Sequence, residues 1–560
     1  MLGTVVVDDG ICTGRLGLRH ELRKNVVDAS IAALSVVEIF HLGVREFGRR
    51  RAREKADSVL GRLLARSRSG LGIAKLRCAK EHDASCQLVA HKLHVVFPKR
   101  MMDGLPRRQR DTTATFAAVG RALNGTVTPV DPRTATWAVQ DGFMTVPDYN
   151  FRPFPASRFV TPTRTVQRMT PVAIRAHTAT TALGRGRQAQ ADALREGRSG
   201  LRENDFSHAP LACWIGRVDG VENEALPAAL VGWECRNNRL AWIALQQDGV
   251  MDAVGTMVER HGAERVALVV GTSTSSIGAS EEAYERLVDG AFPPDLARPI
   301  IHTPHSLGDF LQHTTGLRGP CITVATACSS SAKVFAQAAR LIQSGVVDAA
   351  LVGGVDTLCG SVLFGFNSLG LVSVQPCRPF DAQRDGISLG EAGGFAVLER
   401  AADGEDGLQL LGYGESSDAH HMSTPHPQGL GAQLAMRDAL ARAGLDPADI
   451  DHLNLHGTAT PANDRVEAIA IAALFPDSLH AASTKGFTGH TLGAAGIVES
   501  VFAMIALEDG ILPATLGSTT PDPACGPQIR FAAETQAIRH AMNNSFGFGG
   551  NNCSLVFGRV

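Results

Sequence analysis

The stretch CITVATACSSSAKVFAQAARLIQSG, residues 321–345, is the clearest indication of the fold class of this chain. It opens with apolar residues typical of a buried strand, passes through a turn of small residues, and continues as a helix that ends at Gly345. A strand that leads through a tight turn into a helix is the repeating unit of α/β folds. The stretch therefore predicts an α/β fold with a buried sheet.

Other parts of the chain repeat this order of elements. VALVVGTSTSS (266–276) predicts a strand entering a glycine turn, and DAALVGGVD (348–356) predicts another buried strand. DHLNLHGTATPAND (451–464) and HAASTKGFTGHTLGAAGIVESVFAMIALEDG (480–510) each predict a strand followed by a polar turn, and the second continues into a helix rich in Ala and Gly. Because both halves carry a strand, a turn with a reactive side chain and a helix, the pattern indicates an internal duplication.

The composition excludes several classes of protein. The chain has 560 residues, of which 44% are hydrophobic and 20% charged, as in large globular proteins. No run of 18 apolar residues occurs, so we expect no membrane span, and Asp8 and Asp9 interrupt the place where a signal peptide would have its apolar core. The 11 cysteines form no CxxC pair, which favours free thiols in a reducing compartment such as the cytoplasm.

Charge is distributed unevenly along the chain. Residues 1–168 contain 28 of the 54 basic and 15 of the 56 acidic residues, which leaves 26 basic and 41 acidic residues for 169–560. The first segment has little hydrophobic periodicity, and after Pro98 it is rich in Pro, Thr and Arg, as loops are. We expect either a poorly ordered basic extension or a region upstream of the natural start at Met169. The remaining alternative, a basic arm for nucleic acid or an acidic carrier protein, lacks a recognisable nucleic-acid motif.

Cys328 lies between the predicted strand and a helix that begins near Ser329. A thiol at a helix N-terminus lies near the positive end of the helix dipole, which favours the thiolate. The small neighbouring residues leave room for an acyl chain. This cluster by itself fits two interpretations equally, a nucleophile and a buried small apolar residue.

Two further clusters contain histidines. HGTATPAND begins with His456 at the end of a strand, and KGFTGHTLGAAG carries Lys485 and His490 ahead of a helix that contains Glu499. Taken alone, each fits a structural histidine or ordinary helix packing. One cysteine and two histidines on three such turns together predict acyl transfer through a thioester, because they supply a nucleophile and two imidazoles.

Residues 169–560 resemble the elongating β-ketoacyl-ACP synthases of the thiolase superfamily. The resemblance rests on six motifs in one order: GPCITVATACS, RPFDAQRDG, SSDAHHM, HGTAT, STKGFTGH and NSFGFGG. It implies a thiolase-like, five-layered αβαβα fold with two similar halves, residues 169–410 and 411–560, after the extension 1–168. The segments GVDTLC (354–359) and GFNSL (365–369) are similar to those of ketosynthases from aryl-polyene pigment clusters.

The resemblance implies catalytic roles for five residues. Cys328 matches the nucleophile that accepts the acyl group. His456 and His490 match the pair that drives decarboxylation of the malonyl group. Lys485 matches the lysine fixed near these histidines, and Glu499 matches the carboxylate beside it.

Three further residues are implied to bind substrate. Thr458 and Thr460 match threonines that contact the phosphopantetheine arm. Phe548 matches a gating phenylalanine, and its backbone N–H would join that of Cys328 in an oxyanion hole.

The activity implied is a decarboxylative condensation in which malonyl-ACP extends a cysteine-bound acyl group by two carbons, in fatty acid, aryl-polyene or polyketide synthesis. The resemblance implies no metal and no cofactor, because the phosphopantetheine arm belongs to the acyl carrier protein. The partners implied are acyl-ACP, malonyl-ACP and a second subunit, either a second copy or a chain-length factor. The alternative function is that of a non-catalytic chain-length factor, which would lack the nucleophile that Cys328 supplies. Neither nucleic acid nor a membrane is an expected partner.

Overall fold

The structure is a computed structural model that describes residues 94–95, 126–131, 136–140, 167–206 and 211–559. The chain forms two units, residues 1–160 and 161–560. In the first unit, three strands form an antiparallel sheet in the order β1-β3-β2: β1 (His94–Val95), β2 (Thr126–Asp131) and β3 (Thr136–Gln140). The sequence predicted no strand in this segment, and the rest of the predicted extension, apart from Gln167 and Arg168, lies outside the described residues.

The second unit is built on one long sheet with two halves. The strands of the first half are β4 (Val172–Thr181), β8 (Val266–Gly271), β9 (Cys321–Val324), β10 (Ala349–Asp356) and β12 (Ala392–Arg400). The strands of the second half are β13 (Leu408–Ser417), β14 (His452–Asn454), β15 (His480–Ala482), β18 (His540–Gly547) and β19 (Asn551–Arg559). The halves join through a short antiparallel pairing of β13 with β4.

The two halves have the same topology. Starting from the junction, the strand order is β4-β12-β10-β8-β9 in one half and β13-β19-β18-β14-β15 in the other. In both, the two pairings nearest the junction are antiparallel and the two outer pairings are parallel. The first to fifth strands along the chain therefore occupy the same places in both halves. This confirms the internal duplication that the sequence indicated.

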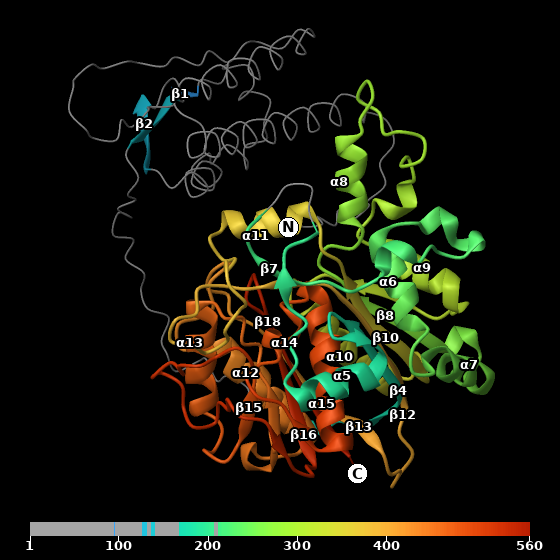
Figure 1. Ribbon diagram of the computed structural model, residues 1–560, viewed down its shortest axis with the longest axis vertical. Coiled ribbons are helices and arrows are strands. Elements are labelled where there is room, and N and C mark those ends of the chain that lie inside the picture. The colour runs from blue at the N-terminus through green and yellow to red at the C-terminus, as the bar shows by residue number, and fades with distance from the viewer. Residues whose placement is uncertain (1–93, 96–125, 132–135, 141–166, 207–210, 560) are drawn as a thin grey trace. The chain divides into compact units, whose positions relative to one another are not determined.

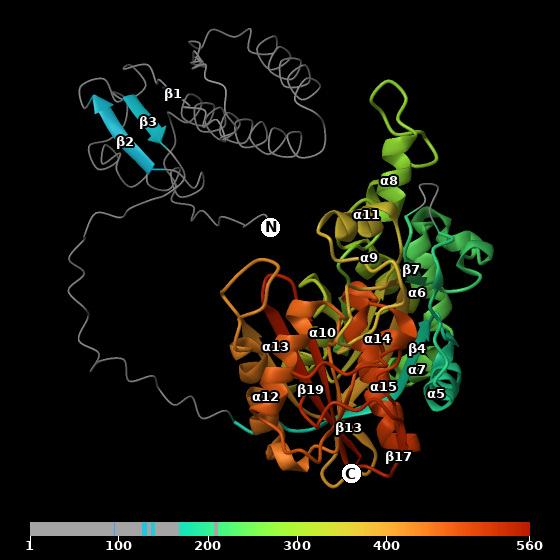
Figure 2. The ribbon, with the colours of Figure 1, turned by 60° about the vertical axis from the view of Figure 1, so that its left-hand side comes forward.

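Helices complete five layers. One outer layer contains α6 (Arg236–Leu245), α7 (Val250–His261) and α9 (Ser306–Thr315), the other contains α12 (Leu430–Ala443) and α13 (Pro461–Ala472), and between the two halves of the sheet lie α10 (Ser330–Gln343) and α15 (Ala495–Asp509). Figure 2 shows these layers side by side, with orange α12 and α13 on one side and green α6 and α7 on the other. The predicted αβαβα architecture is confirmed.

Shorter elements lie around these layers. They include α5 (Gly186–Glu196), α8 (Ile277–Glu285), α11 (Gly360–Ser368) and α14 (Lys485–Thr488). Figure 1 shows α8 and α11 beyond the same end of the sheet. That end holds the carboxyl ends of the parallel strands, where open α/β sheets bind ligands.

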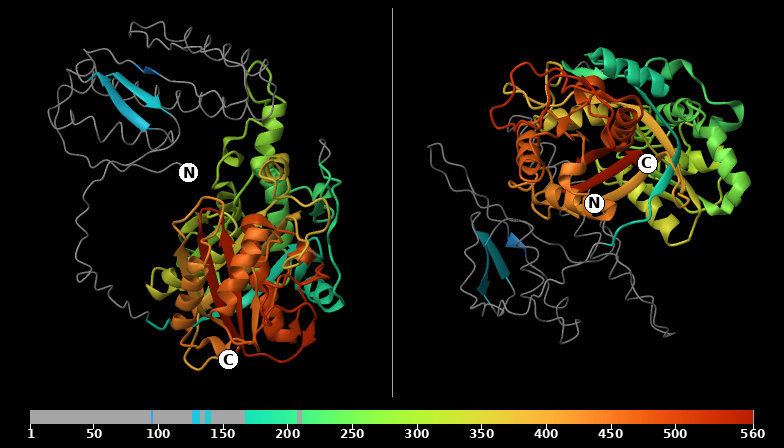
Figure 3. Two further views of the ribbon diagram at one scale, coloured as in Figure 1. Left: turned by 90° about the vertical axis from the view of Figure 1, so that its left-hand side faces the viewer. Right: turned by 90° about the horizontal axis from the view of Figure 1, so that it is seen from below.

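The two central helices are buried because they have sheet on both sides. Every residue of α15 from Ala495 to Leu507 is buried, so this helix is apolar nearly all round. The helices approach closely: a Cβ added at Gly496 would lie 2.3 Å from the backbone nitrogen of Ala332 on α10. In the right-hand view of Figure 3 the orange and red second half lies on one side of the second unit and the green first half on the other. Any polar side chain on α15 must find its partner within the core.

In the described part of the chain, no helix has the length and apolar character needed to cross a bilayer. The cysteines within the same ranges are all free thiols.

A buried histidine pair leads to a prediction about acid stability. His452 on β14 lies with its Nδ1 atom 3.2 Å from Nδ1 of His480 on β15, and burial lowers the pKa of His452 to about 3. In the unfolded chain its pKa would be about 6.5, so protons bind the unfolded state first as the pH falls. The contribution of neutral, buried His452 to the free energy of unfolding is complete above about pH 6.5. It is lost progressively between about pH 6.5 and 3, and the free energy of unfolding falls by up to about 1.4 kcal/mol per pH unit.

We therefore expect His452→Leu to reduce the pH dependence of the free energy of unfolding over this range. Because the variant also leaves His480 without its partner, the slope against pH is compared and not the absolute stability. Urea unfolding at several pH values measures it, with exposed His421→Leu as the control. An unchanged slope in His452→Leu would contradict the prediction.

Candidate active site

Cys328 lies on a strained turn between β9 and α10. Ala327, directly before it, has a left-handed backbone with φ of +53°, which is uncommon for a residue with a side chain. The turn is held by serine hydroxyls: Ser329 donates to the carbonyl of Thr326 at 2.9 Å, and Ser330 donates to that of Ala327 at 2.6 Å. The small, hydroxylated residues of TACSS thus fix the direction of the thiol at the helix N-terminus.

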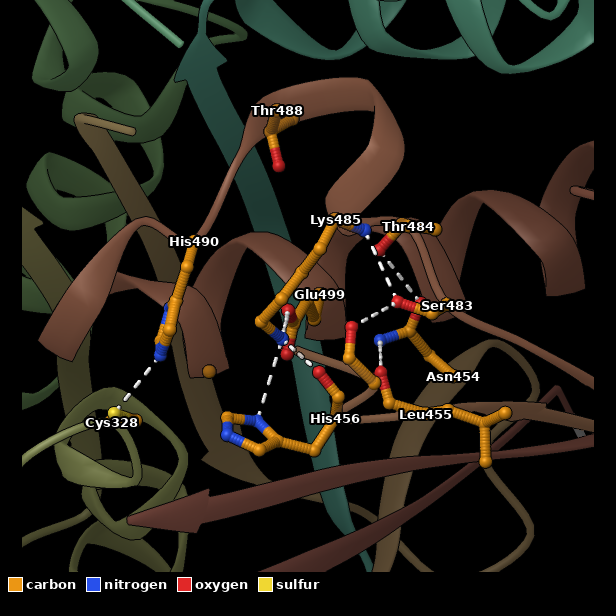
Figure 4. Close-up of polar contacts among 12 residues, drawn as sticks. Cys328, Asn454, Leu455, His456, Ser483, Thr484, Lys485, Thr488, His490 and Glu499 are labelled. Carbon is orange, nitrogen blue, oxygen red and sulfur yellow. Dashed lines mark hydrogen bonds and ion pairs between the residues drawn. The ribbon is translucent and has the colours of Figure 1, made fainter. Parts of the chain in front are cut away.

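His490 reaches the cysteine from the second half of the sheet. Its Nε2 atom lies 3.0 Å from Sγ of Cys328, a contact that Figure 4 marks with a dashed line. The other ring nitrogen, Nδ1, accepts the backbone N–H of Leu492 at 3.2 Å. Because Nδ1 accepts a hydrogen bond, the proton of the neutral ring lies on Nε2 and points toward the cysteine.

His456 occupies the third corner of the site. Its ring lies 5.4 Å from that of His490, centroid to centroid and nearly perpendicular. Nζ of Lys485 lies 3.4 Å from Nδ1 of His456 and also donates to the His456 carbonyl. An ammonium group can only donate, so Nδ1 accepts, and His456 also carries its proton on Nε2.

The lysine is held by a carboxylate on the central helix. Nζ of Lys485 lies 2.5 Å from Oε1 of Glu499, and both side chains are almost completely buried (Figure 4). Burial raises the pKa of Glu499 to about 7, while the ammonium of Lys485 acts in the opposite direction. The ion pair places a positive charge behind the two imidazoles without exposing it to solvent.

Burial keeps both imidazoles neutral. It lowers the pKa of His456 and of His490 well below the usual value, and the charge of Lys485 lowers both further. Two neutral rings with protonated Nε2 atoms are hydrogen-bond donors that face one point. Such a pair can stabilise a developing oxyanion.

The thiol of Cys328 is protonated in this environment. Burial raises its pKa to about 11, although the charge of Lys485 and the backbone N–H groups of Phe548 and Cys328 act to lower it. The position of Cys328 at a helix N-terminus had predicted the thiolate. The structure differs because the thiolate loses more solvation free energy on burial than it gains from the local dipoles and the charge of Lys485.

The same three side chains lie close enough together to be considered as metal ligands. A ligand atom from each of Cys328, His456 and His490 lies within 4.8 Å of the others. Metal-bound histidines usually donate their second N–H to a carbonyl or carboxylate. Here both Nδ1 atoms face donors, Leu492 N–H and the Lys485 ammonium, so Nε2 offers a proton and not a lone pair. The donor set does not fit a resident metal ion.

The three residues lie at a cavity of about 350 Å³. Thr458 and Thr460 also line it, and their hydroxyls are 2.9 Å apart. Phe548 lines the cavity with its ring 6.0 Å from that of Phe366. All eight residues singled out in the sequence therefore lie in this cavity or directly behind it, at the buried Lys485–Glu499 pair.

Two buried acids in the same region were missed in the sequence. Glu467 accepts the backbone N–H groups of His456 at 2.8 Å and of Gly457 at 2.7 Å, and burial raises its pKa to about 7. Asp464, one turn earlier on α13, accepts the N–H of Ala459, whose φ is +66°. The available signal was two acids three residues apart on a helix face that is otherwise apolar.

The buried ion pair leads to a stability prediction. Glu499→Gln should lower the free energy of unfolding by about 3–5 kcal/mol, because it leaves the Lys485 charge buried without a counterion. Lys485→Met combined with Glu499→Leu should recover much of that loss. The control is Glu282→Gln, which breaks the exposed Arg286–Glu282 pair and should cost less than about 1 kcal/mol. Urea unfolding measures all three, and equal losses in Glu499→Gln and Glu282→Gln would contradict the prediction.

The chain is similar to the proteins of a known family. A model of the β-ketoacyl synthase N-terminal domain matches residues 169–404, and a model of its C-terminal domain matches residues 409–519. Nodulation protein E of Rhizobium meliloti (strain 1021) is 35% identical over 386 residues, which cover 66% of this chain and 94% of that protein. The mitochondrial 3-oxoacyl-[acyl-carrier-protein] synthase of Arabidopsis thaliana is 39% identical over 341 residues, covering 57% and 74%.

Solved structures give the same result for the fold. A ketosynthase from Xenorhabdus doucetiae, in complex with its chain length factor, matches with a TM-score of 0.65 and 37% identity, covering 70% of this chain and 98% of that one. The two family models together cover the first half of the sheet, the first three strands of the second half (β13, β14 and β15) and the three turns that carry Cys328, His456 and His490. The chain therefore belongs to the β-ketoacyl synthase family, as its sequence motifs predicted.

Proposed function

We propose that this chain is an elongating β-ketoacyl-ACP synthase that condenses malonyl-ACP with an acyl group bound to Cys328. The observation that carries the proposal is the arrangement of one thiol and two neutral imidazoles at the same point of a buried cavity. A non-catalytic chain-length factor is not favoured, because it would not need a nucleophile 3.0 Å from an imidazole.

The first step is transfer of the acyl group to the enzyme. Sγ of Cys328 attacks the thioester carbonyl of acyl-ACP, and the bond to the phosphopantetheine sulfur breaks. The proton of the Cys328 thiol ends on that departing sulfur. The backbone N–H groups of Cys328 and Phe548 face the sulfur and are available to bind the oxyanion that forms during attack.

The second step is decarboxylation and condensation. The malonyl thioester carbonyl accepts hydrogen bonds from Nε2 of His456 and His490, carbon dioxide leaves, and the electron pair remains as an enolate. The enolate carbon attacks the acyl–Cys328 carbonyl and releases the cysteine sulfur, which takes a proton from water. Neutral imidazoles suit this step because they stabilise the enolate oxygen without carrying a readily transferred extra proton.

The polar and apolar parts of the cavity fit different parts of the substrate. The hydroxyls of Thr458 and Thr460 can bind the amide groups of a phosphopantetheine arm, which the acyl carrier protein supplies. Phe366, Leu369 and Phe548 provide an apolar lining for an acyl chain. Phe548 lines the cavity and its backbone N–H lies at the sulfur of Cys328, so its ring is suited to gate access to the cysteine.

A second subunit is part of the proposal. Strand β9 ends the sheet, and all four of its residues are half-buried, so its edge can pair with another chain. Ketosynthases that are 37% and 28% identical to this chain have been solved with chain length factors. This supports a heterodimer with a chain-length factor as the alternative to a homodimer. The similarity of residues 354–359 and 365–369 to aryl-polyene ketosynthases supports a pigment pathway.

The reaction is tested with purified protein, malonyl-ACP and a series of acyl-ACP primers. We expect an acyl adduct on the protein and a β-ketoacyl-ACP product two carbons longer, both detected by mass spectrometry. Cys328→Ala should give neither, because it removes the attacking sulfur. Cys321→Ala, on the strand before the turn, is the matched control and should retain the adduct. An adduct that persists in Cys328→Ala would exclude the assigned nucleophile.

The division of labour between the residues is tested by timing two steps separately. His456→Ala and His490→Ala should each slow carbon dioxide release from malonyl-ACP by about 10²–10³-fold, the usual effect of removing one oxyanion donor. Acylation of Cys328 should fall much less. His313→Ala, on α9 and outside the cavity lining, should leave both rates near normal. Equal losses in the two steps would show that the histidines do not act mainly in decarboxylation.

A further inference from the structure

The turn that follows His490 has a strained backbone. Leu492 has a φ of +56°, a left-handed conformation that is unfavourable for a leucine, and its side chain is buried. Such a conformation persists only where neighbouring groups hold it in place. The backbone N–H of this same residue is the group that donates to Nδ1 of His490.

The next residue is anchored by an acid from the other half of the fold. Gly493 donates its backbone N–H to Oδ2 of Asp356 at 2.7 Å and to the hydroxyl of Ser273 at 3.1 Å. A Cβ at this position would lie 2.6 Å from Oδ2 of Asp356 and 2.5 Å from the Ser273 nitrogen, so only glycine can approach so closely. The contact therefore depends on the absence of a side chain at residue 493.

Asp356 is itself held in one orientation. It ends β10 and is completely buried. Its Oδ1 atom accepts the hydroxyls of Thr272 and Thr274, each at 2.6 Å, and the backbone N–H of Thr274 at 2.9 Å. Its Oδ2 atom accepts the N–H of Ser273 at 2.9 Å as well as that of Gly493. With donors on both oxygens, the carboxylate cannot rotate without losing several hydrogen bonds.

We propose that Asp356 is a positioning residue for His490. Through Gly493 it fixes the strained turn, the turn aims the Leu492 N–H at Nδ1 of His490, and this contact keeps the imidazole proton on Nε2, facing Cys328. Asp356 is absent from the cavity lining, so it acts through the turn and not on the substrate. The expected kinetic effect rests on the proposed function, because it is measured on decarboxylation. The expected tautomer of His490 does not depend on that function.

Asp356→Asn is the decisive variant because it changes one oxygen into a donor. Backbone N–H groups lie at both oxygens, that of Thr274 at Oδ1 and those of Ser273 and Gly493 at Oδ2, so the NH₂ group opposes a backbone N–H in either orientation. The amide oxygen is also a weaker acceptor than the carboxylate, so the anchor on Gly493 is weakened. Thr274→Val is the matched control, since it removes one hydroxyl from Oδ1 and leaves the contact of Oδ2 with Gly493.

Two measurements are made on the full chain. ¹⁵N NMR of histidine-labelled protein reports which nitrogen of His490 is protonated, with the signals assigned by their loss in His490→Ala. Carbon dioxide release from malonyl-ACP and single-turnover acylation of Cys328 are timed separately. For Asp356→Asn we expect a shift from the Nε2–H tautomer to a mixture and carbon dioxide release slowed about tenfold or more. Acylation should change much less, and Thr274→Val should keep the tautomer and most of the rate.

An unchanged tautomer in Asp356→Asn would overturn the proposal. So would the finding that Thr274→Val lowers the two rates by as much as Asp356→Asn does. If Asp356→Asn does not fold, Ser273→Ala replaces it, because the Ser273 hydroxyl contacts both Asp356 and the Gly493 N–H. It should move the tautomer in the same direction by a smaller amount, and no movement would again overturn the proposal. If the unaltered protein releases no carbon dioxide, the proposed function fails, while the NMR result still decides the role of Asp356.

Discussion

The contact between the two central helices sets the geometry of the site. Gly496 on α15 and Ala332 on α10 meet almost backbone to backbone, which is possible only because residue 496 has no side chain. Cys328 lies just ahead of α10 and His490 just ahead of α15. A fixed distance between the helices therefore fixes the distance between sulfur and imidazole. A larger residue at this contact would separate the helices and with them the two reacting groups.

The duplication explains why these groups meet. The turn after β9 and the turn after β15 hold equivalent places in halves with the same strand order. The loop after β14, which carries His456, is in turn equivalent to the loop after β8, which contributes Thr272 and Ser273 to the carboxylate of Asp356. Thus one half supplies the nucleophile and an anchoring acid, and the other supplies both imidazoles.

Desolvation gives this site its electrostatic character. Two imidazoles lie close to an ammonium group, and burial together with that charge keeps them uncharged. The Lys485 charge is itself balanced by Glu499, on a helix that has no exposed face along most of its length. Burial also raises the pKa of the Cys328 thiol, so the neutral thiol is the resting form. The backbone N–H groups around it are therefore free to bind the negative charge that develops during the reaction.

The amino-acid sequence alone was enough to predict the α/β class, the internal duplication, the family and the eight residues around the cavity, because apolar periodicity and long motifs are local properties of the chain. It missed Asp464 and Glu467, whose function lies in accepting backbone N–H groups that no motif identifies. Three properties emerge only in the folded chain: the protonation of Cys328, the tautomers of His456 and His490, and the link from Asp356 to Gly493. Burial and hydrogen-bond partners set these properties, and the partners lie as far apart in sequence as residues 356 and 493.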